Sequence, residues 1–136
     1  MGIEAQTANT LIAAVADNFA AVYPIAYPDR DFTPPAVPEV YLEIAFLPNG
    51  SARSGLSSQD AHQGILQVSV MNPAGSGVVS PMTIAGTVAD VFDHKRIVGT
   101  GHSVTVPNRP VIGQPFPDGN YSRTPVTINY VSESTT

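Results

Sequence analysis

The sequence contains no cysteine and no tryptophan, and only 12% of its 136 residues are charged. Without cysteine the chain has no disulfide framework, no thiolate zinc site and no thiol nucleophile. The low charge leaves a surface made largely of neutral polar and apolar groups. Such groups cost little to desolvate, so this composition favours contact with other proteins.

Basic residues are also scarce, because six Lys and Arg face eleven Asp and Glu, for a net charge of −5. Binding to duplex DNA needs basic side chains that displace condensed counterions, and the scattered basic residues form no patch. We therefore expect no tight binding to nucleic acid. The charge is compatible with DNA passing close by without being held.

Long apolar runs are missing as well. No stretch approaches the ~20 residues that cross a bilayer, and the first residues show no basic region followed by an apolar run. We expect no secretory signal and no membrane contact, and a soluble protein made in a cytoplasm.

What the chain does contain is enough apolar sequence for a core, 43% hydrophobic residues, together with 13 prolines and 11 glycines. The length is that of one ordinary domain. We expect a single domain over residues 1–131 and a flexible polar tail over residues 132–136.

Two segments show helical spacing. The first is expected to start at a cap on Thr7 or Asn9 and to end before Pro24. The second starts at Ser80-Pro81, a strong helix start, and is closed by residues 93–96. The apolar stripe of the first comprises Leu11, Ile12, Val15, Phe19 and Val22, and that of the second Met82, Ala85, Val88, Ala89 and Phe92.

Four segments alternate as strands do, namely residues 39–47, 65–71, 102–106 and 126–130, and a short extra strand is expected near Val111-Ile112. The proline-rich residues 24–38 are expected to cross the surface in an extended form. The order α–β–β–α–β–β predicts an α+β fold. In it, an antiparallel-rich four-stranded sheet carries both helices on one face.

Residues 48–64 form a long polar segment between two strands that are expected to pair as a hairpin. Loops longer than about 12–15 residues are uncommon within compact domains and are usually functional or disordered. We expect this segment to project as a mobile hairpin arm, and the alternative is a solvated excursion without a role.

A search for chemistry finds only fragments of sites. Asp60 and His62 could offer metal ligands, but no third ligand lies nearby. The segment that begins at Gly101-His102-Ser103 resembles a nucleophile elbow, yet Thr105 replaces its final glycine. Asp90, Asp93 and His94 share a helix end that solvation explains. We expect no enzyme activity, no cofactor and no bound metal.

The order of motifs resembles the tail terminator-like proteins of tailed bacteriophages and related gene transfer agents. It rests on four segments: VYLEIAFLPNG (40–50), HQGILQVSVMNPAGSG (62–77), SPMTIAGTVADVF (80–92) and PVTINYV (125–131). The resemblance implies a virion structural protein that forms a ring, commonly a hexamer, on the head-proximal end of the tail tube. Such a ring stops tube elongation and meets the head-side neck or connector protein.

The resemblance also implies that subunits and partners meet at the hairpin arm and the sheet edges. The residues expected at such interfaces are Glu43, Arg53, Leu56, Gln59 and His62. Two alternatives remain at this point. One is a head–tail connector protein on the head side, and the other is a small metal-dependent hydrolase or ligand-binding domain built on Asp60 and His62.

Overall fold

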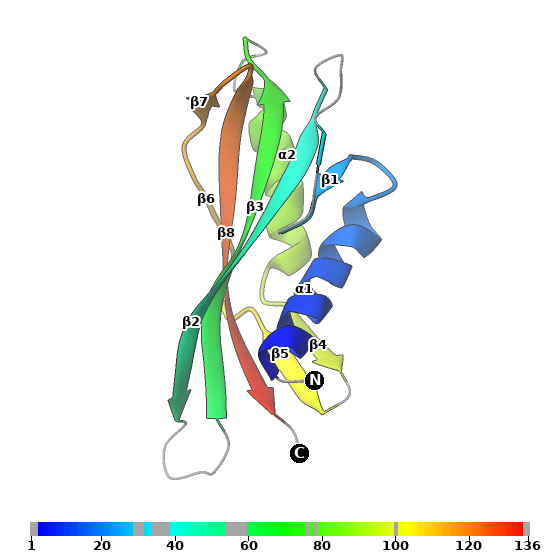
Figure 1. Cartoon of the computed structure of the whole chain (residues 1–136). Helices are drawn as coiled ribbons and strands as arrows, with labels where there is room; N and C mark the ends of the chain where they lie inside the picture. Colours follow the sequence, from blue (N-terminus) through cyan, green and yellow to red (C-terminus); the bar gives the residue numbers. More distant parts are fainter. Residues whose placement is uncertain are drawn as a thin grey trace.

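The computed structural model describes residues 3–28, 32–33, 39–53, 60–75, 77, 79–99 and 101–134. Two helices and one curled mixed sheet make up the α+β fold (Figure 1). The helices are α1 (Ile3–Phe19) and α2 (Val79–Phe92). The strands are β1 (Ile25–Ala26), β2 (Tyr41–Arg53), β3 (Asp60–Pro73), β4 (Arg96–Gly99), β5 (His102–Thr105), β6 (Val111–Ile112), β7 (Phe116–Asp118) and β8 (Tyr121–Ser134).

The sheet has eight strands, so the expectation of four was wrong. The strand order is β1-β2-β3-β8-β5-β4, and β6 and β7 pair with β8. Only the β1–β2 pairing is parallel. Of the additional strands, β6 had been predicted as a short one. The sequence missed β1 and β7, which have two and three residues and are too short to show a period of two. It also missed β4, because Arg96, which begins it, was assigned to the end of the preceding helix.

The segment predicted as a polar loop is mostly strand. β2 continues to Arg53 and β3 begins at Asp60, with an irregularity in register between Pro48 and Ser51. β8 supports this extension from the other side, since residues 61–64 of β3 pair with residues 130–133. In Figure 1 the lower part of the β2–β3 hairpin runs away from both helices.

Both helices pack on the same side of the sheet and share one hydrophobic core (Figure 1). The predicted stripes supply most of their buried side chains. The fully buried members include Leu11 and Val15 of α1, Val88 and Phe92 of α2, and Leu42, Leu66, Val68, Val126 and Ile128 of the sheet. Two stripe residues are exposed: Val22, at 66%, because α1 ends at Phe19, and Met82 of α2, at 40%.

The start of α1 and the end of β8 also differ from expectation. α1 begins at Ile3, so Thr7 lies inside the helix rather than at its cap. Its hydroxyl is buried and lies 2.6 Å from the hydroxyl of Ser132. Residues 132–134, assigned from the sequence to a flexible tail, form the end of β8, where Ser132 is fully buried.

α2 begins at Val79, and the predicted Ser80-Pro81 start lies in its first turn. It ends at Phe92, and His94 follows with a φ of 52°, a left-handed conformation that commonly terminates helices. Arg96, which had been assigned to the closing turn of the helix, is instead the first residue of β4.

Candidate assembly surface

One face of the sheet packs against the helices, and the other, here called the outer face, does not. Side chains alternate between the faces along each strand, and the register places Glu43, Ser69 and Pro125 in one row of the outer face. The outer face further includes Ala45, Leu47, Gln63, Ile65, Gln67, Val98, Thr105, Val111, Phe116, Arg123, Thr127, Asn129 and Val131.

The outer face gathers exposed apolar side chains. Among the described residues, seven large hydrophobic side chains are exposed, and four of them lie on this face: Leu47, Val98, Val111 and Phe116. On β2, β3 and β8, the rows from Ala45 to Val131 contain no charged residue, and Arg96 of β4 lies at the edge of the Val131 row. A surface that is largely neutral, partly apolar and not covered by either helix is suited to contact with another protein.

A cluster of paired charges lies at one end of this face, around Arg123, whereas Arg96 and Glu133 lie toward the other end. Arg123 Nη2 lies 3.0 Å from Glu43 Oε2 and its Nε donates to Asp118 Oδ2 at 2.9 Å, while Nη1 donates to Glu43 Oε1 at 3.3 Å. Burial opposes the positive charge, but these hydrogen bonds outweigh it and raise the pKa of Arg123. The cluster joins β2, β7 and β8 into a rigid, nearly neutralised end of the face.

Beside this cluster, aromatic rings cover the end of the outer face. The ring of Phe32 lies 4.9 Å from that of Tyr41, which meets Tyr121 edge-on at 5.1 Å. Burial, and then the nearby charge of Glu43, raise the pKa of Tyr41. The uncovered part of the outer face therefore begins beyond this end, at the row of Ala45.

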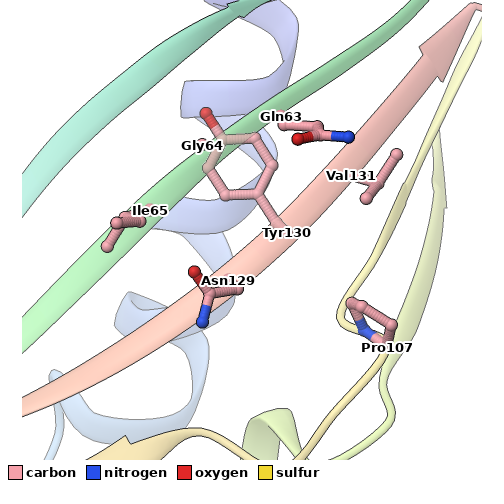
Figure 2. A pocket seen from close by; sticks show the side chains of 7 residues that line it. All are labelled: Gln63, Gly64, Ile65, Pro107, Asn129, Tyr130 and Val131. Atoms are coloured by element: carbon pink, nitrogen blue, oxygen red, sulfur yellow. The ribbon is translucent and has the colours of Figure 1, made fainter. Parts of the chain in front are cut away.

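A hollow of about 230 Å³ lies on the part of the outer face that is away from the Arg123 cluster (Figure 2). It is lined by Gln63, Ile65, Asn129, Val131 and Pro107. Gly64 and Tyr130, a cross-strand pair, also border it. Figure 2 shows the ring of Tyr130 crossing over Gly64. A Cβ on Gly64 would lie 2.3 Å from the Tyr130 hydroxyl, so only glycine fits there. Burial raises the pKa of Tyr130 to about 12.

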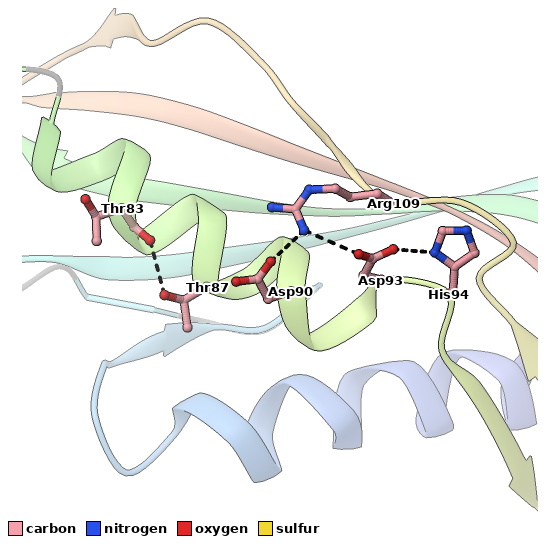
Figure 3. A network of polar contacts seen from close by, with 6 residues as sticks. All are labelled: Thr83, Thr87, Asp90, Asp93, His94 and Arg109. Carbon is pink, nitrogen blue, oxygen red and sulfur yellow. Dashed lines mark hydrogen bonds and ion pairs between the residues drawn. The ribbon is translucent and has the colours of Figure 1, made fainter.

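A second polar cluster lies at the end of α2 (Figure 3). Arg109 Nη1 lies 2.5 Å from Asp90 Oδ1 and 3.5 Å from Asp93 Oδ2, and Asp93 Oδ1 lies 2.5 Å from His94 Nδ1. The hydrogen bond to Asp90 raises the pKa of Arg109. The sequence identified the solvated helix end but not Arg109, because no local pattern links residues 16 to 19 positions apart.

The structure does not bring the predicted interface residues together on one surface. Glu43 lies on the outer face, whereas His62 pairs with Ser51 and Ser132 and lies on the opposite face. The backbone of Arg53 ends β2 opposite Asp60. Leu56 and Gln59 lie outside the described residues. The sequence missed Arg123, since only the register of β8 against β3 and β2 places it beside Glu43.

Two kinds of site are absent from the described residues. In that part of the chain, no group of three or more His, Asp or Glu side chains is placed to hold a metal ion. Neither described helix is long and apolar enough to cross a membrane.

Comparison with known proteins adds to this geometry. A family model described as phage tail terminator protein matches residues 6–130. No curated protein matches the chain significantly. One solved structure has 24% sequence identity and a TM-score of 0.71, over 91% of this chain and 94% of its own. At that identity the likeness shows the fold alone.

Proposed function

The chain belongs to the phage tail terminator family and is thus a structural protein of the phage tail, and from this premise we propose its place in the particle. It forms a ring, a hexamer by the resemblance of its motifs, on the head-proximal end of the tail tube. There it stops addition of tube subunits and meets the head-side neck or connector protein. The observation that carries the proposal is the family match over residues 6–130.

The outer face supports an assembling role. It offers exposed Leu47, Val98 and Val111 on a face whose central rows are uncharged, and another protein chain can cover these apolar side chains at little desolvation cost. Glu43, Arg53, Leu56, Gln59 and His62 remain our proposed contact positions. Because Glu43 and His62 lie on opposite faces, they would contact different partners or different subunits.

The charges also suit a channel that DNA crosses without being held. Arg109 and Arg123 are paired with carboxylates, so neither presents a free positive charge to a phosphate backbone. The ring would accordingly let DNA pass without specific binding.

Mixing the purified protein with polymerising tail tube protein tests the function. We expect electron microscopy to show a cap on one end of each tube and a tube-length distribution that stops growing once the protein is added. Tubes that continue to elongate at saturating protein would contradict the proposal. A heat-unfolded sample of the chain serves as the control.

A head-side connector is the second candidate from the same structural class. It would bind DNA-filled heads in the absence of tails and leave tube length unchanged. Co-sedimentation with purified heads and with purified tubes, run in parallel, separates the two functions.

A further inference from the structure

We infer that copies of this chain join head to tail through their sheet edges, β4 of one copy pairing in parallel with residues 44–47 of β2 in the next. This inference rests on the proposed ring function and names the contact that builds the ring. Its occupant is a second copy of this chain.

The sheet has two open edges that suit such a contact. β4 pairs only with β5, and β1 covers β2 only at Leu42 and Glu43, so no other described strand pairs with either outer edge. Every pairing from β2 to β4 is antiparallel and four pairings separate them, so the two edge strands run in the same direction. Joining unlike edges in one direction is a heterologous contact, and such a contact builds a ring when the rotation between successive copies closes.

The open stretch of β2 has defined limits. Pairing with β1 ends at Glu43, and the irregularity in register begins at Pro48, which has no N–H to donate. Residues 44–47 remain between them. For the sheet to continue from one copy to the next, side chains of the outer face must stay on the outer face. We therefore place Val98 of one copy beside Leu47 of the next, and Arg96 beside Ala45.

Side-chain chemistry matches in this register. Leu47 is 51% and Val98 68% exposed, and the contact would cover both. Arg96 is exposed, and no hydrogen bond or ion pair links its side chain to the described part of the chain. In the proposed contact, Arg96 would lie diagonally from Glu43 of the neighbouring copy, whose side chain is 37% exposed. The basic residue at the edge of one copy thus meets the acidic residue at the edge of the next.

The helix side of β4 has room for the incoming strand. A groove of about 390 Å³ runs between α1 and β4, lined among others by Ala13, Asp17, Ile97 and Gly99. In the proposed register the neighbour's residue 46, a phenylalanine, lies beside Ile97 on this side. A strand added at an edge beside such a groove gains backbone hydrogen bonds and side-chain contacts together.

Disulfide trapping tests the contact, because the chain has no cysteine of its own. In the variant L47C/V98C, mild oxidation should give a ladder of covalent multimers that a reductant collapses. Within one copy the two positions are four strand spacings apart across the sheet, about 19 Å, and their rows are also four residues apart along β8. This is too far for a disulfide, whose Cα atoms lie about 4.4–6.8 Å apart. Any disulfide between positions 47 and 98 is therefore intermolecular.

The controls separate edge pairing from other associations. L47C alone and V98C alone should give no covalent dimer, whereas a two-fold contact through either edge would give one and overturn the proposal. The pair L47C/V79C, whose second position is exposed on α2, should give no ladder. Rings seen by electron microscopy without a ladder in L47C/V98C would overturn the edge contact while leaving the proposed function intact. Absence of rings from the unmodified chain, alone and on tubes, would instead count against the function.

A backbone variant gives an independent readout. The backbone N–H of Val106 donates to the carbonyl of Lys95, so these two residues form a hydrogen-bonded pair. Hydrogen-bonded and non-hydrogen-bonded pairs alternate along an antiparallel hairpin. Val98 is therefore in a non-hydrogen-bonded pair with Ser103, and its N–H points toward the open edge. V98P should therefore abolish multimers while the thermal midpoint stays close to that of V98T, which should still assemble. Assembly of V98P at the level of V98T would contradict the inference.

Discussion

At the scale of single residues, the pair of Gly64 and Tyr130 shows how a side chain on one strand fixes the residue on the next. The Tyr130 ring occupies the space that a side chain at Gly64 would need, and it reaches Phe46 at a centroid distance of 5.6 Å. Stacking an aromatic ring over a strand glycine compensates for the missing side chain.

We expect Gly64→Ala to destabilise the fold by about 1–3 kcal/mol, since the new methyl group forces the Tyr130 ring to move. Gly86→Ala is the control, because nothing lies within 4 Å of its added Cβ. In the interior of α2 that change should be neutral or stabilise by about 0.5–1 kcal/mol. Urea unfolding of both variants measures the difference, and equal effects would contradict the packing account.

The raised pKa of Tyr130 predicts a loss of stability in alkali. The unfolded phenol ionises near its ordinary value of 10.0, whereas the folded one holds its proton to about 12. The contribution is therefore complete below about pH 10 and is lost as the pH rises toward 12. Thermal melting between pH 9 and 12 should show a smaller decline for Tyr130→Phe than for the unchanged chain, and parallel declines would contradict this.

Arg123 and Arg109 offer a matched comparison of a half-buried and an exposed ion pair. The side chain of Arg123 is 21% exposed and that of Arg109 46%. We expect Arg123→Met to cost about 1–3 kcal/mol, because two carboxylates lose their partner, and Arg109→Met to cost less, because water screens an exposed ion pair. Denaturant unfolding ranks them, and a larger effect at Arg109 would be inconsistent with the structure.

At the scale of elements, α1 is fixed to the end of β8 by a buried hydroxyl pair. Thr7 and Ser132 are both almost fully buried, and their oxygens lie 2.6 Å apart. A neighbouring contact joins Thr10 Oγ1 and His102 Nε2 at 2.8 Å, which fixes the same helix to β5. The first helix is thus positioned by polar contacts as well as by its apolar stripe.

Thr7→Val should cost about 1–2 kcal/mol, because it leaves the Ser132 hydroxyl without this partner in a buried place. Thr83→Val, which removes only an exposed bond to the Val79 carbonyl, should cost less. A double-mutant cycle with Ser132→Ala measures the pair directly. A coupling energy near zero would show that the two hydroxyls do not depend on each other.

At the scale of the whole molecule, a net acidic charge is combined with an outer face whose central rows are uncharged. The net charge is −5, and two arginines are held by carboxylates. Assembly can then use neutral surface while the particle's DNA meets no basic patch.

The assembled ring should accordingly retain no DNA. Filter binding of labelled duplex at low salt, where electrostatic attraction is strongest, should stay at background. The variant E43Q/D118N, which releases Arg123 from its partners, provides a comparison of higher positive charge. Tight binding by the unmodified ring at low salt would rule out passive passage.

The sequence by itself determined the two helices, the four principal strands and the β2–β3 hairpin, because each carries its own apolar period. It also determined the family, through motifs that lie in those elements, and the match over residues 6–130 confirms that resemblance. The strands β1, β4 and β7 and the paired arm were not predicted, since each is short or polar and is held as a strand by the neighbour it pairs with in the sheet.

Only the tertiary structure decided which residues meet. Residues 80 positions apart form the Glu43–Arg123 pair, and residues 125 apart form the Thr7–Ser132 pair. Such contacts follow from strand order and register, which the local pattern of one chain does not encode. The same register separates Glu43 from His62 and leaves the edges of β2 and β4 open. The sequence thus predicted that this protein assembles, and the fold supplied the surfaces on which that assembly can be tested.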